Sequence, residues 1–333
     1  MRITNEILLK LANDTVARRV QDDHSLLAAY LHGSLLRETP LLGNATDVDL
    51  FYIHNDEVSL EREIIRLTDE VHLDIAHHSH KVYRQPRELR QHPWLGPAIN
   101  SCKILYDPQH FLDFAQASVR GQFNRPDQVV GRVSSLSEHA RQIWLDFHLE
   151  PREPGPQDIL KYMRAIEHAA NSIAGISGPP LTERRFLLDL PARVDAVQRH
   201  GLYAGVLGLL GAPTVDAETL RSWLPAWQAA FIGLPAAQAP LRLHPHRLPY
   251  YQHAIETILG SERYQDALWP FWHTWTVAIN ALPEDSAHRA GWEEAGRRLG
   301  QIGAGFVERI RALDAFLDTV EDALEVWARE NGA

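Results

Sequence analysis

The chain has 333 residues, which exceeds the usual size of one compact domain, so we expect two domains, each with its own core. Hydrophobic residues make up 45% and charged residues 23%, a balance that excludes an intrinsically disordered chain. The formal net charge of −10 argues against broad nucleic-acid binding, because affinity for a phosphate backbone comes mainly from Lys and Arg.

Features that bear on the compartment point to the cytoplasm. The first residues, from Met1 to Glu6, lack the apolar segment of a secretory signal, and no stretch approaches the roughly 18 apolar residues of a membrane span. Cys102 is the only cysteine, which excludes an internal disulfide and fits a reducing compartment. We expect a cytoplasmic protein that does not enter a membrane, with a buried, structural thiol at Cys102.

The first hundred or so residues predict an α+β unit. Apolar side chains recur at helical spacing from Asn5 to about Gln21, which predicts an amphipathic first helix. The next predicted elements, in chain order, are strands at Leu26–Leu31 and Asp47–Ile53, a helix at Leu60–Asp69, and strands at Val71–Ala76 and Lys103–Tyr106. We therefore expect a small mixed sheet with helices packed against it.

The rest of the chain predicts helices without convincing strands. Helical periodicity marks residues 129–148, 157–174, 184–201, 259–282 and 287–327. Prolines predict a hinge at about residues 150–157. We place an α+β domain at residues 1–125 and an all-α domain at residues 126–333. The aromatic side chains between Trp269 and Trp275 fit a helix-bundle core better than a ligand pocket.

Two aspartates on the second predicted strand carry the strongest chemical signal. Side chains at i and i+2 of a strand share a face, so Asp47 and Asp49 are expected to stand side by side. Burying two adjacent carboxylates is unfavourable unless a cation or a proton compensates, and Mg²⁺, which prefers oxygen ligands, is the natural counter-charge. Asp74 has apolar neighbours on the next strand and is expected to complete a triad. The pattern therefore predicts a Mg²⁺ site.

Residues that suit a phosphate group follow the first predicted strand. Gly33 at a strand-to-helix turn permits close backbone approach, and the following amides, with the Ser34 hydroxyl, can hold phosphate oxygens at a helix N-terminus. Arg37, one turn later, adds positive charge toward a β- or γ-phosphate. Lys161, on a helix of the second domain, is a further candidate for nucleotide contact, with an exposed cation on an amphipathic helix as the alternative.

Together these motifs resemble those of the DNA polymerase β-type nucleotidyltransferase superfamily, whose pattern is a hydrophobic residue before Gly-Ser, a loop, Asp-x-Asp on a strand and a later carboxylate. The matching segments are Leu31-His32-Gly33-Ser34, Asp47-Val48-Asp49, Leu73-Asp74-Ile75 and the closing strand Lys103–Tyr106. Thr46 stands where Ser is common in the family, which keeps a hydroxyl. The resemblance covers about residues 26–107, and the layout with a following helical domain is similar to that of aminoglycoside nucleotidyltransferases.

What the resemblance implies is an enzyme that moves a nucleotidyl group, commonly AMP from ATP, to a hydroxyl of a small acceptor and releases pyrophosphate. Asp47 and Asp49 would hold two Mg²⁺ ions, one bridging the triphosphate and the other lowering the pKa of the acceptor hydroxyl. Asp74 would bind the second ion or accept the proton. Most of the rate enhancement would come from positioning and charge neutralisation.

Other interpretations of the same residues are open. The acceptor is a protein or RNA end in some toxin–antitoxin members of the superfamily, although the acidic balance disfavours RNA. A non-catalytic nucleotide-binding protein is a third interpretation, against which the retained carboxylates argue. In another interpretation, Asp47 and Asp49 are loop or helix-cap residues, because turn-forming residues precede them. For Asp74 the alternative is a solvated strand residue. His77, His78 and His80 offer a transition-metal site as an alternative to Mg²⁺.

Overall fold

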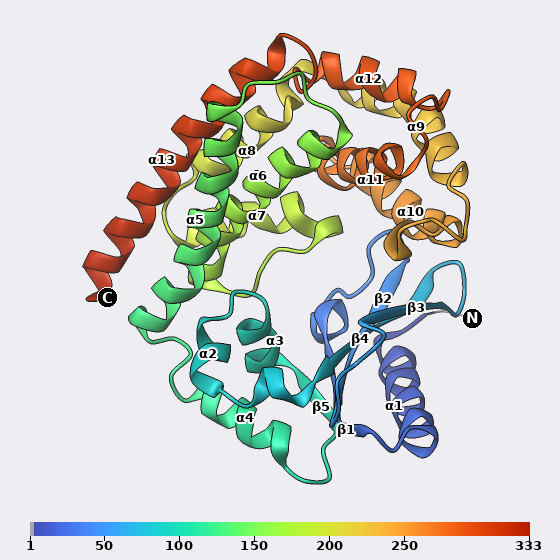
Figure 1. Ribbon diagram of the computed structural model, residues 1–333, viewed down its shortest axis with the longest axis vertical. Coiled ribbons are helices and arrows are strands. Elements are labelled where there is room, and N and C mark those ends of the chain that lie inside the picture. Colours follow the sequence, from blue (N-terminus) through green and yellow to red (C-terminus); the bar gives the residue numbers. More distant parts are fainter. Residues whose placement is uncertain (1–2) are drawn as a thin grey trace. The chain divides into compact units, whose positions relative to one another are not determined.

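A computed structural model describes residues 3–333 and divides the chain into two compact units, Met1–Gln128 and Val129–Ala333. The first unit combines a mixed β-sheet with helices, and the second is helical (Figure 1). This confirms the predicted α+β class with a following all-α region. Among the described residues, no helix combines the length and the apolar character that crossing a bilayer requires.

A five-stranded sheet with the order β3-β4-β2-β1-β5 forms the centre of the first unit. Its strands are β1 (Leu26–His32), β2 (Thr46–His54), β3 (Arg62–Arg66), β4 (Val71–Ser79) and β5 (Lys103–Tyr106). The pair β2 and β4 is parallel, and the other neighbouring pairs are antiparallel. Four of the five strands were predicted from the sequence.

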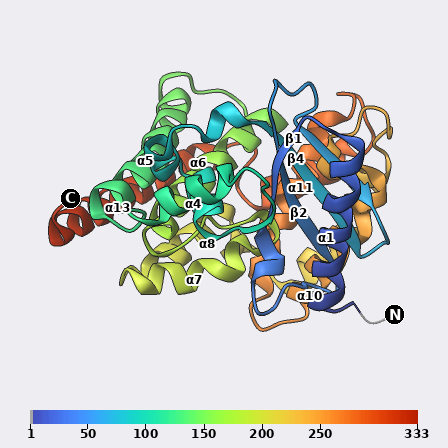
Figure 2. The same ribbon diagram turned by 90° about the horizontal axis from the view of Figure 1, so that it is seen from below.

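Helix α1 (Asn5–Asp22) covers one face of this sheet, as Figure 2 shows. The Thr4 hydroxyl caps the helix by accepting a hydrogen bond from the amide of Ile7 at 3.3 Å. The apolar stripe of the helix and the inward side chains of β2 form one core, which contains Leu8, Ala12, Val16, Val48, Leu50 and Tyr52. The predicted first helix is confirmed, because its helical spacing matched a face that the sheet buries.

Three short helices border the opposite face: α2 (Pro86–Gln91), α3 (Leu95–Ser101) and α4 (Phe111–Arg120). Their apolar side chains share a core with Ala28, Tyr30 and Ile53 of the sheet. Cys102 belongs to this core, and burial raises the pKa of its thiol to about 12. The thiol is therefore protonated and structural, as predicted.

Residues 60–69 do not form the predicted helix. The strand β3 (Arg62–Arg66) lies in this segment and pairs with β4 at the edge of the sheet. The Thr68 hydroxyl shapes the connecting turn by accepting hydrogen bonds from two following amides at 3.1 and 3.2 Å. Ile64 and Ile65 are β-branched and lose side-chain freedom in a helix. The helix prediction was wrong because pairing with β4 outweighed a helix-like apolar spacing.

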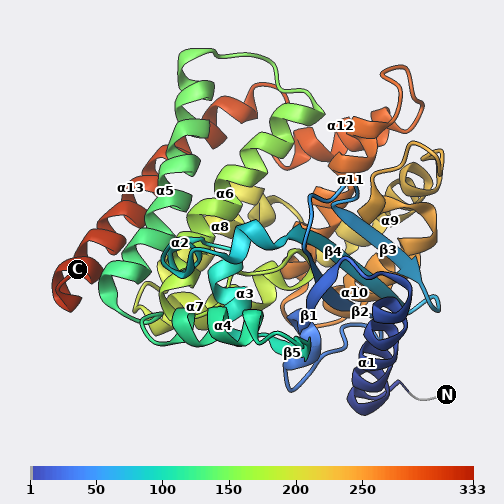
Figure 3. The ribbon, with the colours of Figure 1, turned by 60° about the horizontal axis from the view of Figure 1, so that its bottom comes forward.

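The second unit is helical throughout. Its helices are α5 (Pro126–Leu149), α6 (Pro156–Ser177), α7 (Phe186–Ala196), α8 (Gly201–Leu210), α9 (Ala217–Ile232), α10 (Leu248–Leu259), α11 (Leu268–Ala281), α12 (Arg289–Arg298) and α13 (Gly305–Asn331). Arg141 on α5 pairs with three carboxylates of α13 at 2.6, 2.7 and 2.8 Å, so these helices run side by side (Figure 3).

Two predicted helices of this unit are each divided. Residues 259–282 contain only the last residue of α10, Leu259, and then α11, which begins at Leu268, while residues 287–327 contain α12 and most of α13. Gly300 and Gly303, with φ of +68° and +72°, lie between α12 and α13. Glycine adopts this left-handed backbone easily, and the helical direction changes there. Periodicity alone did not reveal the breaks, because both sides keep helical spacing.

Tryptophans fill the core of the second unit. Trp227, Trp272 and Trp275 have no exposed surface, and the indole of Trp272 donates a 2.8 Å hydrogen bond to the Gln301 side chain. The indole of Trp227 donates to the Thr274 hydroxyl at 3.0 Å. Each of these bonds satisfies an indole N–H that burial removes from water. The predicted assignment of this aromatic segment to the core is confirmed.

Candidate metal centre on the sheet

Three aspartates gather on one face of the sheet, at the strands β2 and β4. Oxygen atoms of Asp47, Asp49 and Asp74, one from each carboxylate, lie within 4.8 Å of one another. Asp47 and Asp74 are only 6% and 5% exposed, and Asp49 is half-buried. The cluster predicted from the sequence therefore exists in the structure as a set of neighbouring, mostly buried carboxylates.

Strand geometry brings the three together. Asp47 and Asp49 are two positions apart on β2, so their side chains share a face. The parallel register places Asp49 directly beside Asp74 on β4. A shift of one residue in this register would turn Asp74 to the α1 side. The alternating residues of β2, Val48 and Leu50, enter the core under α1 and hold the strand in place.

This donor set fits a hard divalent cation. Carboxylate oxygens are the ligands that Mg²⁺ and Ca²⁺ prefer, whereas the described residues contribute no sulfur or imidazole ligand to this group. Like charges at this separation repel strongly unless positive charge lies among them. A cation held by Asp47, Asp49 and Asp74 would relieve that repulsion. The cluster suits a metal site of the oxygen-only kind.

Gly33 lies directly against this cluster. It follows β1 with φ of +83°, a left-handed conformation that favours glycine. A Cβ at this position would lie 1.9 Å from Oδ2 of Asp49 and 2.7 Å from its Cγ. Any side chain at Gly33 would therefore displace the Asp49 carboxylate. The glycine that the sequence assigned to a phosphate-holding turn also makes room for a candidate metal ligand.

The segment after Gly33 is a four-residue 3₁₀ turn, Gly33–Leu36, rather than the start of an α-helix. The Ser34 and Thr46 hydroxyls lie 3.0 Å apart within hydrogen-bond distance, which ties the turn to the strand that carries Asp47. The amide of Arg37 closes the turn by donating to the carbonyl of Ser34 at 3.0 Å. So short a turn has a weak dipole, and any anion here would depend on individual amides.

The arginine Arg62, which sequence analysis missed, binds the carboxylate of Asp74. Nε of Arg62 donates to Oδ1 of Asp74 at 2.6 Å, and Nη2 donates to Oδ2 at 2.8 Å. Such bidentate pairing is strong and fixes the plane of the carboxylate. Arg62 was hidden in the segment predicted as a helix. The sequence of β3, Arg-Glu-Ile-Ile-Arg, has no alternation of charged and apolar residues, so no local signal marked Arg62 as the partner of Asp74.

The opposite side of β3 is anchored as well. Glu63 accepts a hydrogen bond from Arg19 of α1 and lies 3.0 Å from Nε2 of His77. Nδ1 of His77 lies 2.9 Å from Nε2 of His54, which continues the network along the α1 face. Arg62 and Glu63 are consecutive, so their side chains point to opposite faces of β3. Contacts on both faces therefore fix the strand and hold Arg62 over Asp74.

The histidines after Asp74 do not form a transition-metal site. His77 faces α1, whereas Nδ1 of His78 lies 2.6 Å from the Tyr83 hydroxyl on the opposite face. His80 packs edge-on against Phe111. Burial, followed by the charge of Arg62, lowers the pKa of His78 to about 4, so this imidazole is neutral at neutral pH. The alternative based on these histidines is therefore not supported.

Comparison of the chain with models of known protein families finds no match, and comparison with curated proteins finds none either. The geometry of the site therefore carries the functional assignment. The structure places Asp47, Asp49, Asp74, Gly33 and Ser34 in one region of the first unit.

The two predicted cationic nucleotide ligands have different surroundings. Arg37 follows the Gly33–Leu36 turn and is half-buried, and its charge contributes, after burial, to lowering the pKa of His32 to about 4. Lys161 lies on α6 of the second unit, where its ammonium is 3.9 Å from a carboxylate oxygen of Asp146. Contact of either cation with a nucleotide stays a prediction.

Proposed function

We propose that the chain is a Mg²⁺-dependent nucleotidyltransferase that moves a nucleoside monophosphate, from ATP or another triphosphate, to a hydroxyl of a small acceptor with release of pyrophosphate. The observation that carries the proposal is the cluster of Asp47, Asp49 and Asp74 beside the Gly33 turn. Its order along the chain is that of the DNA polymerase β-type superfamily, to which the sequence motifs are similar.

Each residue of the cluster has a role in this proposal. Asp47 and Asp49 would hold Mg²⁺, which supplies charge neutralisation for the triphosphate and activation of the acceptor hydroxyl. Backbone amides of the turn that begins at Gly33 would bind phosphate oxygens, and Ser34 would keep that turn in register with β2. Arg37 would lie toward the outer phosphates, and Lys161 would add a cation from the helical unit.

Asp74 is better suited to hold a metal than to accept the proton of the acceptor. Both of its oxygens accept hydrogen bonds from Arg62, at 2.6 and 2.8 Å. This pairing fixes the carboxylate, and one of its oxygens lies within 4.8 Å of oxygens of the other two aspartates. A fixed orientation is favourable for a ligand, whereas a proton acceptor must reach the acceptor hydroxyl. We therefore assign Asp74 to metal binding, positioned by Arg62.

The test is incubation of the protein with each labelled nucleoside triphosphate, Mg²⁺ and a panel of hydroxylated acceptors while pyrophosphate release is followed. Release that depends on one small acceptor supports the proposal. Release that depends only on an added protein or RNA would establish the alternative acceptors instead. Tight triphosphate binding without any release would support a non-catalytic nucleotide-binding protein and would overturn the proposal.

Two carboxamide variants test whether the activity depends on the cluster. Asp47→Asn and Asp49→Asn each remove one negative charge with little change of volume, and we expect each to lower turnover by at least about a thousandfold. Asp69→Asn is the matched control, because Asp69 lies on the exposed turn between β3 and β4 and is 53% exposed. Equal activity of all three variants would remove the cluster from the reaction.

A further inference from the structure

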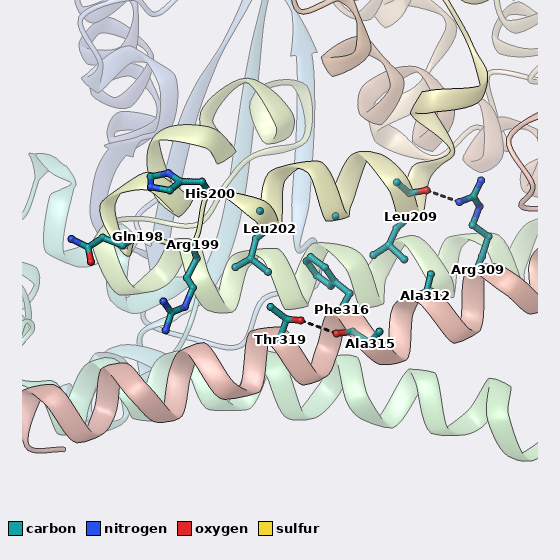
Figure 4. Close-up of a pocket in the computed structure, with 13 residues that line it drawn as sticks. Gln198, Arg199, His200, Leu202, Leu209, Arg309, Ala312, Ala315, Phe316 and Thr319 are labelled. Carbon is teal, nitrogen blue, oxygen red and sulfur yellow. Dashed lines mark hydrogen bonds between the residues drawn. The ribbon is translucent and has the colours of Figure 1, made fainter.

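A groove runs between α8 and α13 in the helical unit, and it contains none of the aspartates discussed above. Its volume is about 730 Å³, which is within the range of small-molecule sites. Small and apolar side chains of both helices make up most of its wall, among them Leu202, Leu209, Ala312, Ala315 and Phe316 (Figure 4). An apolar ligand of moderate length would fit this volume.

Two glycines keep this groove open although the fold does not require them. A Cβ added at Gly201 or Gly208 would meet no atom within 4 Å, and neither residue has a left-handed backbone. Glycine inside a helix is less stable than alanine, so Gly208 forgoes helix stability without a packing reason, whereas Gly201 is the first residue of α8. Gly205 differs, because a Cβ there would lie 2.9 Å from Phe316. The open space beside Gly201 and Gly208 is therefore available to a ligand.

Positive charge borders the groove at both ends. Figure 4 shows Arg199 and Arg309 near opposite ends of the lining residues. Arg309 donates to the carbonyls of Gly208 at 2.6 Å and Leu299 at 2.8 Å, and these acceptors carry no net charge. Among the described residues, no carboxylate forms an ion pair with either guanidinium. In a chain of net charge −10, this arrangement favours an anion at the groove.

Arg199 is the better of the two for binding a ligand. The donors of Arg309 are partly used on backbone carbonyls. Arg199 is half-buried, lines the groove and also borders an adjoining hollow that contains Glu330. The neighbouring His200 has Nδ1 2.6 Å from a carboxylate oxygen of Asp195, so that acid already has a partner. A guanidinium of this kind matches a carboxylate with two parallel hydrogen bonds.

We propose that this groove binds an amphipathic monocarboxylate, with its apolar chain along Leu202, Leu209 and Phe316 and its carboxylate on Arg199. The site is a second one, which belongs to the helical unit alone and does not depend on nucleotide or Mg²⁺. Apolar burial supplies the affinity, and the charge at Arg199 selects the head group.

Calorimetric titration with dodecanoate, below its micelle concentration and without nucleotide or Mg²⁺, tests the proposal. We expect saturable binding to one site. Gly208→Leu should weaken it by about tenfold or more, since the added side chain fills the groove. Ala204→Leu is the matched control, because Ala204 is exposed on the same helix and does not line the groove. It should change the affinity by less than about twofold.

Head-group selectivity gives a second, independent readout. Arg199→Met should weaken dodecanoate binding by about tenfold and leave the binding of dodecanol unchanged. Dodecyltrimethylammonium should bind more weakly than dodecanoate. Absence of saturable dodecanoate binding, equal binding by Gly208→Leu and Ala204→Leu, or tighter binding of the cationic probe would each overturn the proposal. These results do not depend on whether the aspartate cluster transfers nucleotides.

Discussion

Substitution of Gly33 by alanine tests the contact between the turn and the Asp49 carboxylate. The added Cβ would lie 1.9 Å from Oδ2 of Asp49, whereas unstrained contacts between heavy atoms are about 3.5 Å. Asp49 must therefore move by more than about 1 Å or rotate away. The left-handed backbone of Gly33, with φ of +83°, adds a penalty of about 1–2 kcal/mol for alanine.

Gly303→Ala separates the two effects. Gly303 has a similar φ of +72°, but a Cβ there would meet nothing within 4 Å. Both variants should lose about 1–2 kcal/mol of unfolding free energy from backbone strain. Only Gly33→Ala should also weaken metal binding, by about tenfold or more, because one ligand is displaced. If the chain is a nucleotidyltransferase, kcat/KM should fall about a hundredfold in the same variant.

The assay pairs urea unfolding with calorimetric titration of Mg²⁺ and of Mn²⁺, which takes the same oxygen ligands. Metal affinity is measured at a temperature where both variants are fully folded. Equal metal affinity in Gly33→Ala, Gly303→Ala and the unchanged protein would refute the inference that Gly33 makes room for a metal-binding carboxylate.

Three further predictions concern charges in the two units. Arg62→Met should destabilise the protein by about 2 kcal/mol, because the buried Asp74 carboxylate loses its bidentate partner, and added Mg²⁺ should restore part of this loss. The pKa of His78 is lowered from 6.5 to about 4, so the stability that its neutral form contributes to the fold is complete above pH 6.5 and is lost as the pH falls toward 4. In His78→Phe the free energy of unfolding should therefore fall less steeply over that range, by up to about 1.4 kcal/mol per pH unit. In the pair of Glu183 and His273, burial opposes both charges, yet their hydrogen bond lowers the pKa of Glu183 to about 2 and raises that of His273. The stability from Glu183 is lost as the pH falls from 4.5 toward 2, and that from His273 is lost as the pH rises through its folded pKa, so Glu183→Gln should lose more stability at pH 5.5 than at pH 8.5.

Urea unfolding across the stated pH range measures all three. No loss of stability in Arg62→Met would mean that Asp74 has another partner in solution. An unchanged pH slope in His78→Phe would assign the acid sensitivity to other groups. The same loss at both pH values in Glu183→Gln would point to packing rather than to the charge on His273.

Much of this protein follows from local patterns in its sequence. The first helix, four of the five strands and the helical character of the second unit each come from a local pattern, such as helical periodicity, strand alternation or a short apolar run, that one segment carries by itself. The shared face of Asp47 and Asp49 follows from the two-residue repeat of a strand, whatever the strand pairs with. Gly33 was recognisable because few other residues permit such a turn.

Only the tertiary structure decided which distant residues meet. The parallel register of β2 and β4 sets Asp74 beside Asp49, and a strand in place of the predicted helix brings Arg62 onto Asp74. The groove between α8 and α13 likewise exists only because two helices far apart in the chain lie together. Periodicity reports which face of a segment is buried, but strand register and helix partners depend on energies summed over contacts between segments, which no single segment contains.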